Sequence, residues 1–438
     1  MSAIVARRLA RGKAPRAAFN REEFQMMSKY RALLGASMLA VAAVQPAGAA
    51  EKAEVLHWWT TQSQSKAVKV FADAFSAAGG EWVDNAIVNG DVAKPTGINR
   101  IVGGNPPTVM MMNAGKQFGE LADQGLLRNL DDVAAAEGWQ ASLPADVLAA
   151  VSRDGHIYAV PVNLQTPNWL WYNKALFEKF GVEEPKTWED FFAVADTFQQ
   201  GGIIPLAFGA QAWQQHQLFN GVLAGAGGRD LYMSVFRDKN PEAVRGAEFK
   251  RVAEVYAKLR SYTDPGSPNR SFNEAASMVI TGKAAMHIMG DWEKGEFTSA
   301  GWVAGKDYGC VLGLGEQNFL MDSNVFIMPE TRSESGAKAQ DLMARVMLDK
   351  DVQVEFNNLK GSIPVRNDVD TSGLDACSKI GLEALKDPGK QLAGPDWLAG
   401  ADMLNSLADV VVEYWATPSE TPEQFAEKYA AVLAEFQE

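Results

Sequence analysis

Short apolar runs of strand-like composition alternate with stretches of helical periodicity along most of this sequence. Residues 55–59, Val-Leu-His-Trp-Trp, are predicted to form the first strand. Residues 66–78 are predicted to form a helix, because Ala67, Val70 and Phe71 recur at spacings of three and four. Strands that alternate with helices build layered α/β structures with mostly parallel sheets. The chain is therefore expected to fold as an α/β protein.

The length of the chain, 438 residues, predicts two lobes. Single hydrophobic cores stop growing at about 250 to 300 residues, and longer chains divide. Three apolar runs, residues 157–162, 325–328 and 361–365, are expected to cross between the lobes, so that each lobe is discontinuous. The first lobe is predicted to take residues 51–163 and 319–364, and the second lobe residues 164–318 and 365–438.

The first 50 residues differ from the rest and are predicted to be removed before folding. Residues 27–49 have the pattern of a secretory signal peptide: Lys29 and Arg31, an apolar stretch of about 13 residues that is too short to span a bilayer, and a small-residue cleavage site at residues 47–49. Translation is expected to begin at Met26 or Met27, with an unusually long n-region as the alternative. The mature protein is thus expected in the periplasm.

The charge of the mature chain argues against a nucleic-acid partner. Residues 1–50 carry eight Lys or Arg and two Asp or Glu, so their removal takes the formal net charge from −13 to −19. Phosphate backbones are bound by clustered Lys and Arg, and no such cluster follows the signal peptide.

The two cysteines of the chain, Cys310 and Cys377, are predicted to form a disulfide, because exported pairs meet an oxidising compartment. Two buried free thiols are the alternative. Without nearby histidines the pair cannot make a tetrahedral zinc site, so we expect no metal.

Signatures of catalysis are sparse in the sequence. It contains no Gly-x-Ser-x-Gly elbow, no paired-histidine zinc motif and no phosphate-binding loop. Asp291 and Glu293 lie two residues apart and could act as an acid and a base on a glycosidic bond. A secreted carbohydrate-active enzyme therefore stays open as an alternative. The histidines stand alone in the sequence and are expected to be structural or exposed: His57, His156, His216 and His287.

Tryptophans next to polar residues give a stronger signal. Sugars present C–H faces that stack on indole rings and hydroxyls that need charged or amide partners. Trp58 and Trp59 lie at the end of a predicted strand and before a helix, where open α/β sheets bind ligands. Trp292 directly follows Asp291. Core packing is the alternative for any one of these rings.

Four spaced motifs occur in the chain: His57-Trp58-Trp59-Thr60, residues 168–174 (NWLWYNK), residues 282–292 (GKAAMHIMGDW) and residues 360–366 (KGSIPVR). Together they resemble the glucose/mannose-binding group of family 1 extracellular solute-binding proteins. The resemblance implies the periplasmic binding protein type II fold, in which two discontinuous α/β lobes are joined by a hinge with the ligand cleft between them. It also implies a monomer without a cofactor, and the membrane permease of an ABC importer as the partner.

The same resemblance implies a set of sugar contacts and some departures from the group. Gln64 replaces a usual Glu, Phe272 a stacking Trp, Met111 a Gln and Ala399 a late His. Loss of a hydrogen-bond partner can reject a hydroxyl strongly, so a different sugar, a polyol or a small glycoside is also expected to fit. The predicted sugar-binding residues are Trp58, Trp59, Gln64, Asn113, Phe272, Asp291, Trp292, Asp322 and Lys360.

These observations predict the periplasmic carbohydrate-binding component of an ABC sugar importer, which binds a glucose- or mannose-like monosaccharide by hinge closure. The alternatives are the secreted carbohydrate-active enzyme and a sugar sensor whose closed form engages a receptor.

Overall fold

The computed structural model of the chain describes residues 51–437. The predicted signal peptide and start sites lie outside these residues. Within the described part, no helix is both long and apolar enough to cross a membrane.

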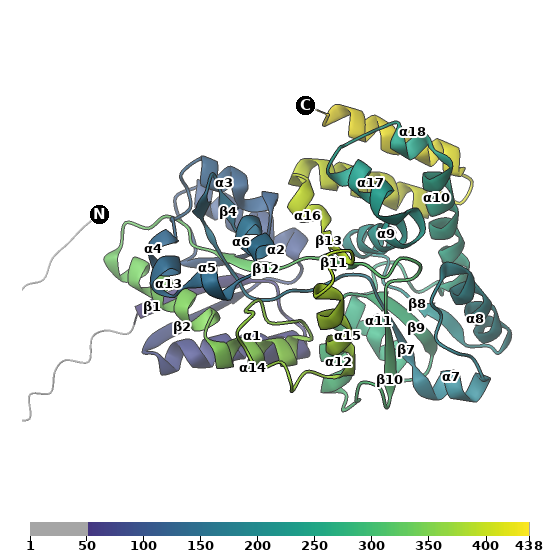
Figure 1. Cartoon of the computed structure of the whole chain (residues 1–438), viewed down its shortest axis with the longest axis horizontal. Helices are drawn as coiled ribbons and strands as arrows, with labels where there is room; N and C mark the ends of the chain where they lie inside the picture. The colour runs from purple at the N-terminus through teal and green to yellow at the C-terminus, as the bar shows by residue number, and fades with distance from the viewer. Residues whose placement is uncertain (1–50, 438) are drawn as a thin grey trace, which may run out of the picture. The chain divides into compact units, whose positions relative to one another are not determined.

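The first lobe is built on a sheet of five strands in the order β2-β1-β3-β12-β6 (Figure 1). β1 is parallel to β2 and β3, whereas β12 is antiparallel to β3 and β6. Both faces of the central strands are buried, which explains their continuous apolar runs. The strands are β1 (Glu51–His57), β2 (Gly80–Ala86), β3 (Val109–Asn113), β6 (Ala159–Pro161) and β12 (Asn324–Ile327).

Helices cover this first sheet and complete its core. The longer ones are α1 (Gln62–Ala77), α2 (Gly90–Val102), α13 (Glu334–Met347) and α14 (Lys350–Lys360). α1 begins earlier than predicted, because Thr61 and Gln64 form a capping box at its N-terminus. Short elements lie between β3 and β6: η1 (Lys116–Phe118), α3 (Gly119–Asp123), α4 (Asp131–Ala136), α5 (Trp139–Ser142), α6 (Ala145–Ala150), β4 (Ser152–Arg153) and β5 (His156–Ile157).

The second lobe is built on a sheet of four strands in the order β10-β7-β9-β8. β7 is antiparallel to both of its neighbours, and only β8 and β9 are parallel. The expectation of mostly parallel sheets is therefore wrong: β7 is antiparallel to both of its neighbours in the second sheet, and β12, which returns to the first sheet after the chain has passed through the second lobe, is antiparallel to β3 and β6. The strands are β7 (Trp169–Asn173), β8 (Ile204–Ala207), β9 (Ala284–Met289) and β10 (Tyr308–Leu312).

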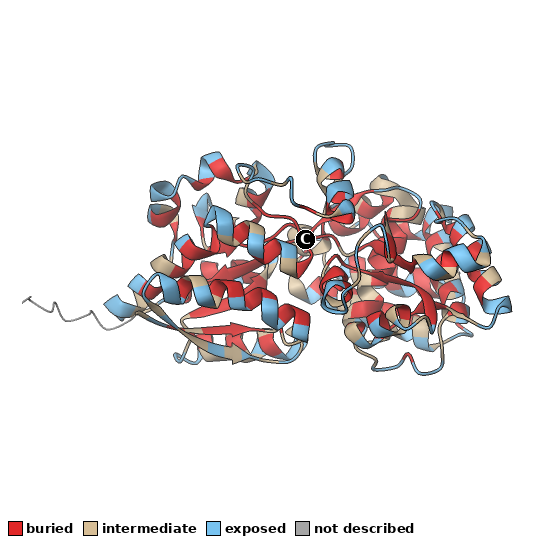
Figure 2. Ribbon diagram, turned by 90° about the horizontal axis from the view of Figure 1, so that it is seen from below, coloured by how far each residue is buried: buried red, intermediate tan, exposed pale blue. Residues whose placement is uncertain are grey.

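The second sheet is packed by helices with large buried aromatic side chains, and Figure 2 shows buried residues concentrated in the strands and on the inner sides of the helices. The long helix among them has a kink at Gly228, where φ is 79°. The helices are α7 (Lys174–Phe180), α8 (Trp188–Gln200), α9 (Ala212–Phe236), η2 (Ala243–Arg245), α10 (Ala247–Leu259), η3 (Arg260–Tyr262), α11 (Phe272–Ile280), α12 (Glu293–Ser299), α17 (Ala401–Ala416) and α18 (Pro422–Glu435).

Three chain segments run side by side between the two sheets, and we call them the hinge strip: residues 162–166, 319–323 and 361–365. Leu164 and Ile363 exchange backbone hydrogen bonds of 2.9 and 2.7 Å, and Gln165 and Asp322 exchange two of 2.9 Å. A small parallel pair, β11 (Phe319–Met321) and β13 (Gln391–Ala393), extends this strip and leads into α16 (Pro395–Leu398).

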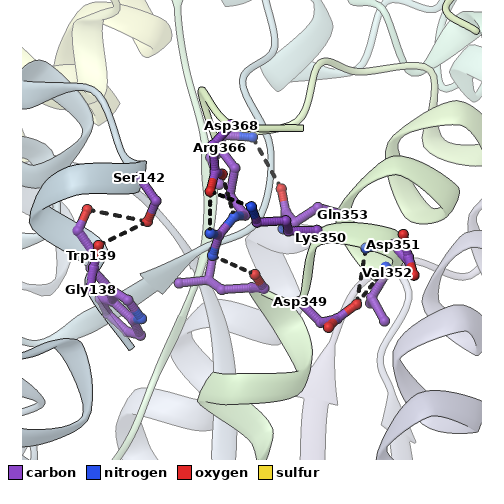
Figure 3. A network of polar contacts seen from close by, with 12 residues as sticks. Gly138, Trp139, Ser142, Asp349, Lys350, Asp351, Val352, Gln353, Arg366 and Asp368 are labelled. Atoms are coloured by element: carbon purple, nitrogen blue, oxygen red, sulfur yellow. Dashed lines mark hydrogen bonds and ion pairs between the residues drawn. The ribbon is translucent and has the colours of Figure 1, made fainter. Parts of the chain in front are cut away.

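Polar contacts and a disulfide hold the residues on either side of the third segment. Arg366 donates to Asp368 through two nitrogens at 2.8 Å and to the Leu348 carbonyl at 2.9 Å, next to the start of α14 (Figure 3). The predicted disulfide is confirmed: Cys310 of β10 is bonded to Cys377 of α15 (Ala376–Leu385). The bond fixes α15 to the second sheet. The sequence positions at which one lobe gives way to the other stay a prediction.

Candidate functional site

A cleft of about 520 Å³ lies among residues of both lobes and of the hinge strip. This volume is typical of a small-molecule site, and its lining mixes aromatic rings with amides and charges. Eight of the nine predicted site residues line it: Trp58, Trp59, Gln64, Asn113, Phe272, Trp292, Asp322 and Lys360.

Aromatic rings from three elements form one wall of the cleft. Trp59 follows β1, Trp292 precedes α12, and Trp213 lies in the first turn of α9. The ring centroids of Trp213 and Trp292 are 6.4 Å apart, and those of Trp213 and Phe272 are 6.2 Å apart. Because β1 ends at His57, Trp58 and Trp59 stand in the loop after the strand and not at its last positions. Trp59 packs deeply, whereas Trp58 is partly exposed.

Lys360 places a cation between two of these rings. It is the last residue of α14, and only 3% of it is exposed. Its Nζ lies 5.2 Å from the Trp292 ring centroid and 5.9 Å from that of Trp59, within cation–π range. Burial lowers the pKa of Lys360 to about 8, and the carboxylates of Asp291 and Asp322 oppose that shift.

Asp322 contributes a carboxylate from the hinge strip. Its Oδ2 accepts a hydrogen bond of 2.8 Å from Gln165 Nε2, and its Oδ1 accepts one of 2.7 Å from the Ser323 amide. Burial, and then the neighbouring Asp396 carboxylate, raises the pKa of Asp322 to about 6. Asp322 therefore has both a fixed position and a free energy cost of remaining charged in the unliganded cleft.

Another part of the cleft wall is held by a polar network that joins β3 and η1 to α16. Asp396 accepts hydrogen bonds from Asn113 Nδ2 at 2.8 Å and from Gln117 Nε2 at 2.6 Å. Lys94 of α2 donates to Gln117 at 3.4 Å and lies 5.8 Å from the Trp58 ring centroid. The polar groups of this wall are thus held in place by one another.

The sequence profile of the family described as bacterial extracellular solute-binding protein matches residues 99–379. The chain belongs to this family. Two relatives named probable sugar-binding periplasmic protein agree with this assignment. The protein of Rhizobium meliloti (strain 1021) is 36% identical over 93% of this chain and all of its own length. The protein of Brucella suis biovar 1 (strain 1330) is 35% identical over 91% of this chain and 96% of its own.

Solved structures confirm the fold of this solute-binding protein. The bacterial solute receptor AcbH, described with a preference for β-D-galactopyranose, superposes with a TM-score of 0.75, at 19% identity, over 88% of this chain and 98% of its own. A chitin oligosaccharide binding protein gives a TM-score of 0.74, at 21% identity, over 87% and 98%. The predicted periplasmic binding protein type II fold is therefore confirmed. Family membership also supports a binding protein in place of the secreted enzyme considered from the sequence.

Asp291 is the predicted site residue that the structure does not bring to the cleft. It is 4% exposed, and its Oδ2 accepts a hydrogen bond of 3.1 Å from the Thr166 amide of the hinge strip. Burial raises its pKa to about 7, against the opposing charge of Lys360. Asp291 thus lies outside the cleft lining, but its carboxylate is close enough to interact with the charges of Lys360 and Asp322, which do line the cleft.

The acidic pair considered for catalysis does not face the cleft of this solute-binding protein either. Glu293 is fully buried, and its Oε1 is 2.8 Å from His287 Nδ1. Neither Glu293 nor Asp291 lines the cleft. The two carboxylates are therefore not arranged on either side of a substrate bond, as the enzyme alternative requires.

Two of the four departures noted in the sequence also lie outside the cleft. Met111 is fully buried within β3, and Ala399 is fully buried in the core of the second lobe. Their side chains cannot change ligand contacts directly, so that part of the prediction is wrong. Gln64 and Phe272 do line the cleft. Gln64 also caps α1 through a 3.4 Å hydrogen bond from the Thr61 amide.

Several cleft residues of the solute-binding protein were missed from the sequence. Four lie on α9, two on the exposed side of α17, and others on α2 and α16. The segment around residues 211–217, rich in Gln with one Trp and one His, carried a usable signal, because amides next to an aromatic ring suit a polar ligand. The missed residues include Lys94, Gln117, Gln165, Trp213, His216, Gln217, Asn220, Asp396, Asn405 and Asp409.

Proposed function

We propose that this solute-binding protein is the periplasmic sugar-binding component of an ABC importer. Its ligand is a glucose- or mannose-like monosaccharide, or a related polyol or small glycoside. The observation that carries the proposal is the composition of the cleft, where indole rings alternate with carboxylates, amides and one buried ammonium group. Apolar ring faces and dense hydroxyl groups occur together in sugars, and this lining complements both.

The names of two relatives support the periplasmic location and the importer's permease as the partner. Proteins of Rhizobium meliloti and Brucella suis that match over nearly the whole chain are called probable sugar-binding periplasmic proteins. An importer's permease is the partner that a periplasmic binding protein of this kind serves. The chain is proposed to act as a monomer and to need no cofactor.

Individual roles follow from the side-chain chemistry. The rings of Trp58 and Trp292 stack on the sugar, while Asp322 accepts hydrogen bonds from its hydroxyls. Lys360 donates a charge-assisted hydrogen bond, which is about twice as strong as a neutral one. Asn113 and Gln64 add amide contacts at the edge of the cleft.

Hinge closure is the proposed mechanism. The ligand binds residues of one lobe first, and rotation about the hinge strip brings the other lobe over it. Closure removes water from the site and strengthens the hydrogen bonds to the ligand. The closed form then presents the sugar to the permease, and no covalent bond changes.

A thermal-shift screen of the mature chain from Ala50 onward tests the proposal. The panel contains D-glucose, D-mannose, D-galactose, D-xylose, L-arabinose, sorbitol, maltose, raffinose and diacetylchitobiose. A ligand that binds only the folded state raises the melting temperature. At a ligand concentration of 100 times Kd it adds about 2.7 kcal/mol to the free energy of unfolding. A shift with glucose or mannose supports the narrower ligand, and a shift with another sugar supports the class. No shift with any member, confirmed by calorimetry, refutes sugar binding.

A further inference from the structure

One face of α9 forms a polar strip in the wall of the cleft. Trp213, His216, Gln217 and Asn220 all line the cleft, and their spacing of three and four residues puts them on the same side of the helix. Two of the four are engaged by the protein. The Trp213 Nε1 donates to Gln211 at 3.0 Å, and the Gln217 Nε2 donates to the Pro167 carbonyl at 2.9 Å.

The other two side chains carry buried polar atoms without a protein partner. The Oδ1 of Asn220 and the Nε2 of His216 are both buried and accept or donate no hydrogen bond within the described residues. Asn220 as a whole is only 5% exposed. Buried polar groups are satisfied in the great majority of native positions, because an unpaired one costs free energy comparable to a lost hydrogen bond. Two such atoms one helical turn apart, in the wall of a binding cleft, need a functional explanation.

We propose that His216 and Asn220 form a second polar contact of the ligand, which fixes the orientation of an uncharged polyhydroxylated ring through two neighbouring hydroxyls. This inference rests on the proposed sugar-binding function and extends it to a helix that lies outside the strand-end motifs. The site so defined is distinct from the charged contacts at Lys360 and Asp322.

The chemistry of the strip matches hydroxyl groups. A side-chain amide offers both a donor and an acceptor, and a neutral imidazole offers one of each, so each can pair with a hydroxyl in either direction. Burial lowers the pKa of His216 to about 4, which keeps its ring uncharged at neutral pH. The charged residues of the cleft lining lie on other elements, among them Asp322, Lys360 and Asp396, and α9 contributes none.

The test uses Asn220→Leu and His216→Phe in the mature chain, with the sugar of the panel above that binds the wild-type protein. Asn168→Leu is the matched control. Asn168 is also 5% exposed, but its amide donates to the Asn318 carbonyl at 3.0 Å and accepts from Thr166. Melting temperatures without ligand and Kd values by calorimetry are measured for all three variants.

Each cleft variant is expected to bind the sugar about tenfold more weakly, while its melting temperature without ligand stays equal to or above that of the wild type. Asn168→Leu should melt at a lower temperature, because it leaves the Thr166 hydroxyl and the Asn318 carbonyl without their hydrogen bonds to Asn168. Unchanged affinity in both cleft variants overturns the inference and leaves sugar binding intact. A fall in the unliganded melting temperature as large as the control's also overturns it, since that result assigns the two side chains to the fold. Failure of every sugar to bind the wild type refutes the proposed function itself.

Discussion

Removal of the disulfide tests how firmly the hinge strip is held. Cys310 lies on β10, and Cys377 is the second residue of α15, with 1% of its surface exposed. The two cysteines are 67 residues apart in sequence. The chain between them leaves the second lobe, builds β12, α13 and α14, and returns through residues 361–365. The bond therefore closes a loop that contains two of the three segments of the hinge strip.

The size of the effect follows from the length of this loop. A cross-link lowers the conformational entropy of the unfolded chain, and for a loop of 67 residues the loss corresponds to about 4 kcal/mol at 25 °C. An unfolding entropy of about 0.8 kcal/mol/K is expected for a chain of this length, so the melting temperature should fall by about 5 °C in a single cooperative transition. The double variant Cys310→Ala/Cys377→Ala removes the bond without leaving a free thiol.

Differential scanning calorimetry compares the variant with the wild type, with and without reductant. Reduced wild type should melt close to the variant, and reductant should leave the variant unchanged. Neither cysteine lines the cleft, so the sugar-induced shift should persist in both proteins. A variant that melts within about 1 °C of the oxidised wild type contradicts the loop-entropy argument.

Four further outcomes are expected. Lys360→Met should weaken sugar binding by about 10- to 100-fold in calorimetry at pH 7, because it removes a charge-assisted hydrogen bond. Lys258→Met is the control and should bind sugar normally. The Nζ of Lys258 lies 3.9 Å from the Phe192 ring centroid, and Lys258 does not line the cleft. Wild-type affinity should fall as the pH rises past about 8, where Lys360 loses its proton, and the Lys360→Met profile should be flat; a wild-type profile unchanged to pH 9 refutes this role. The free energy of unfolding should rise from about pH 8 to 10.5 in the wild type, because over this range the folded protein has released the Lys360 proton and the unfolded chain still holds it. Gly115→Ala should lower the free energy of unfolding in urea by about 2 to 3 kcal/mol, because φ is +97° and a Cβ would meet the Asp396 carbonyl oxygen at 2.3 Å. Gly125→Ala is the control: φ is +67° and a Cβ would stand in open space, so the loss should be about 1 kcal/mol.

The strand-end part of the site could be predicted from the sequence. Trp58 and Trp59 occur where an apolar run gives way to a helical pattern, and chain segments at that position face the crevice of an α/β sheet. Lys360 and Asp322 came from the family resemblance, and the cleft contains both. The disulfide followed from the compartment and the number of cysteines alone.

Orientation within a segment could not be predicted. Asp291 and Trp292 are adjacent, yet only the indole reaches the cleft, because the carboxylate is turned to the Thr166 amide. The periodicity of α9 shows which residues share a face, but it does not show that this face is turned to the cleft. Met111 failed for a related reason: it lies in the middle of β3, where both faces of the strand are buried, and only Asn113 at the end of the strand reaches the cleft.

Two charged groups of the cleft, Asp322 and Lys360, are attached to the hinge strip, about which we propose that the lobes rotate. Asp322 belongs to the second segment of the hinge strip, and Lys360 directly precedes the third. Gly361, with φ +98°, lets the backbone pass close to the Asp291 carbonyl, where a Cβ would be only 2.3 Å from that oxygen. Burial disfavours the charged form of each of these groups, and a ligand that hydrogen-bonds to them removes part of that cost. Because the same backbone carries these charges and joins the lobes, a ligand that holds Asp322 and Lys360 in fixed positions would also fix the strip, and this is how the proposed closure would couple ligand binding to the angle between the lobes.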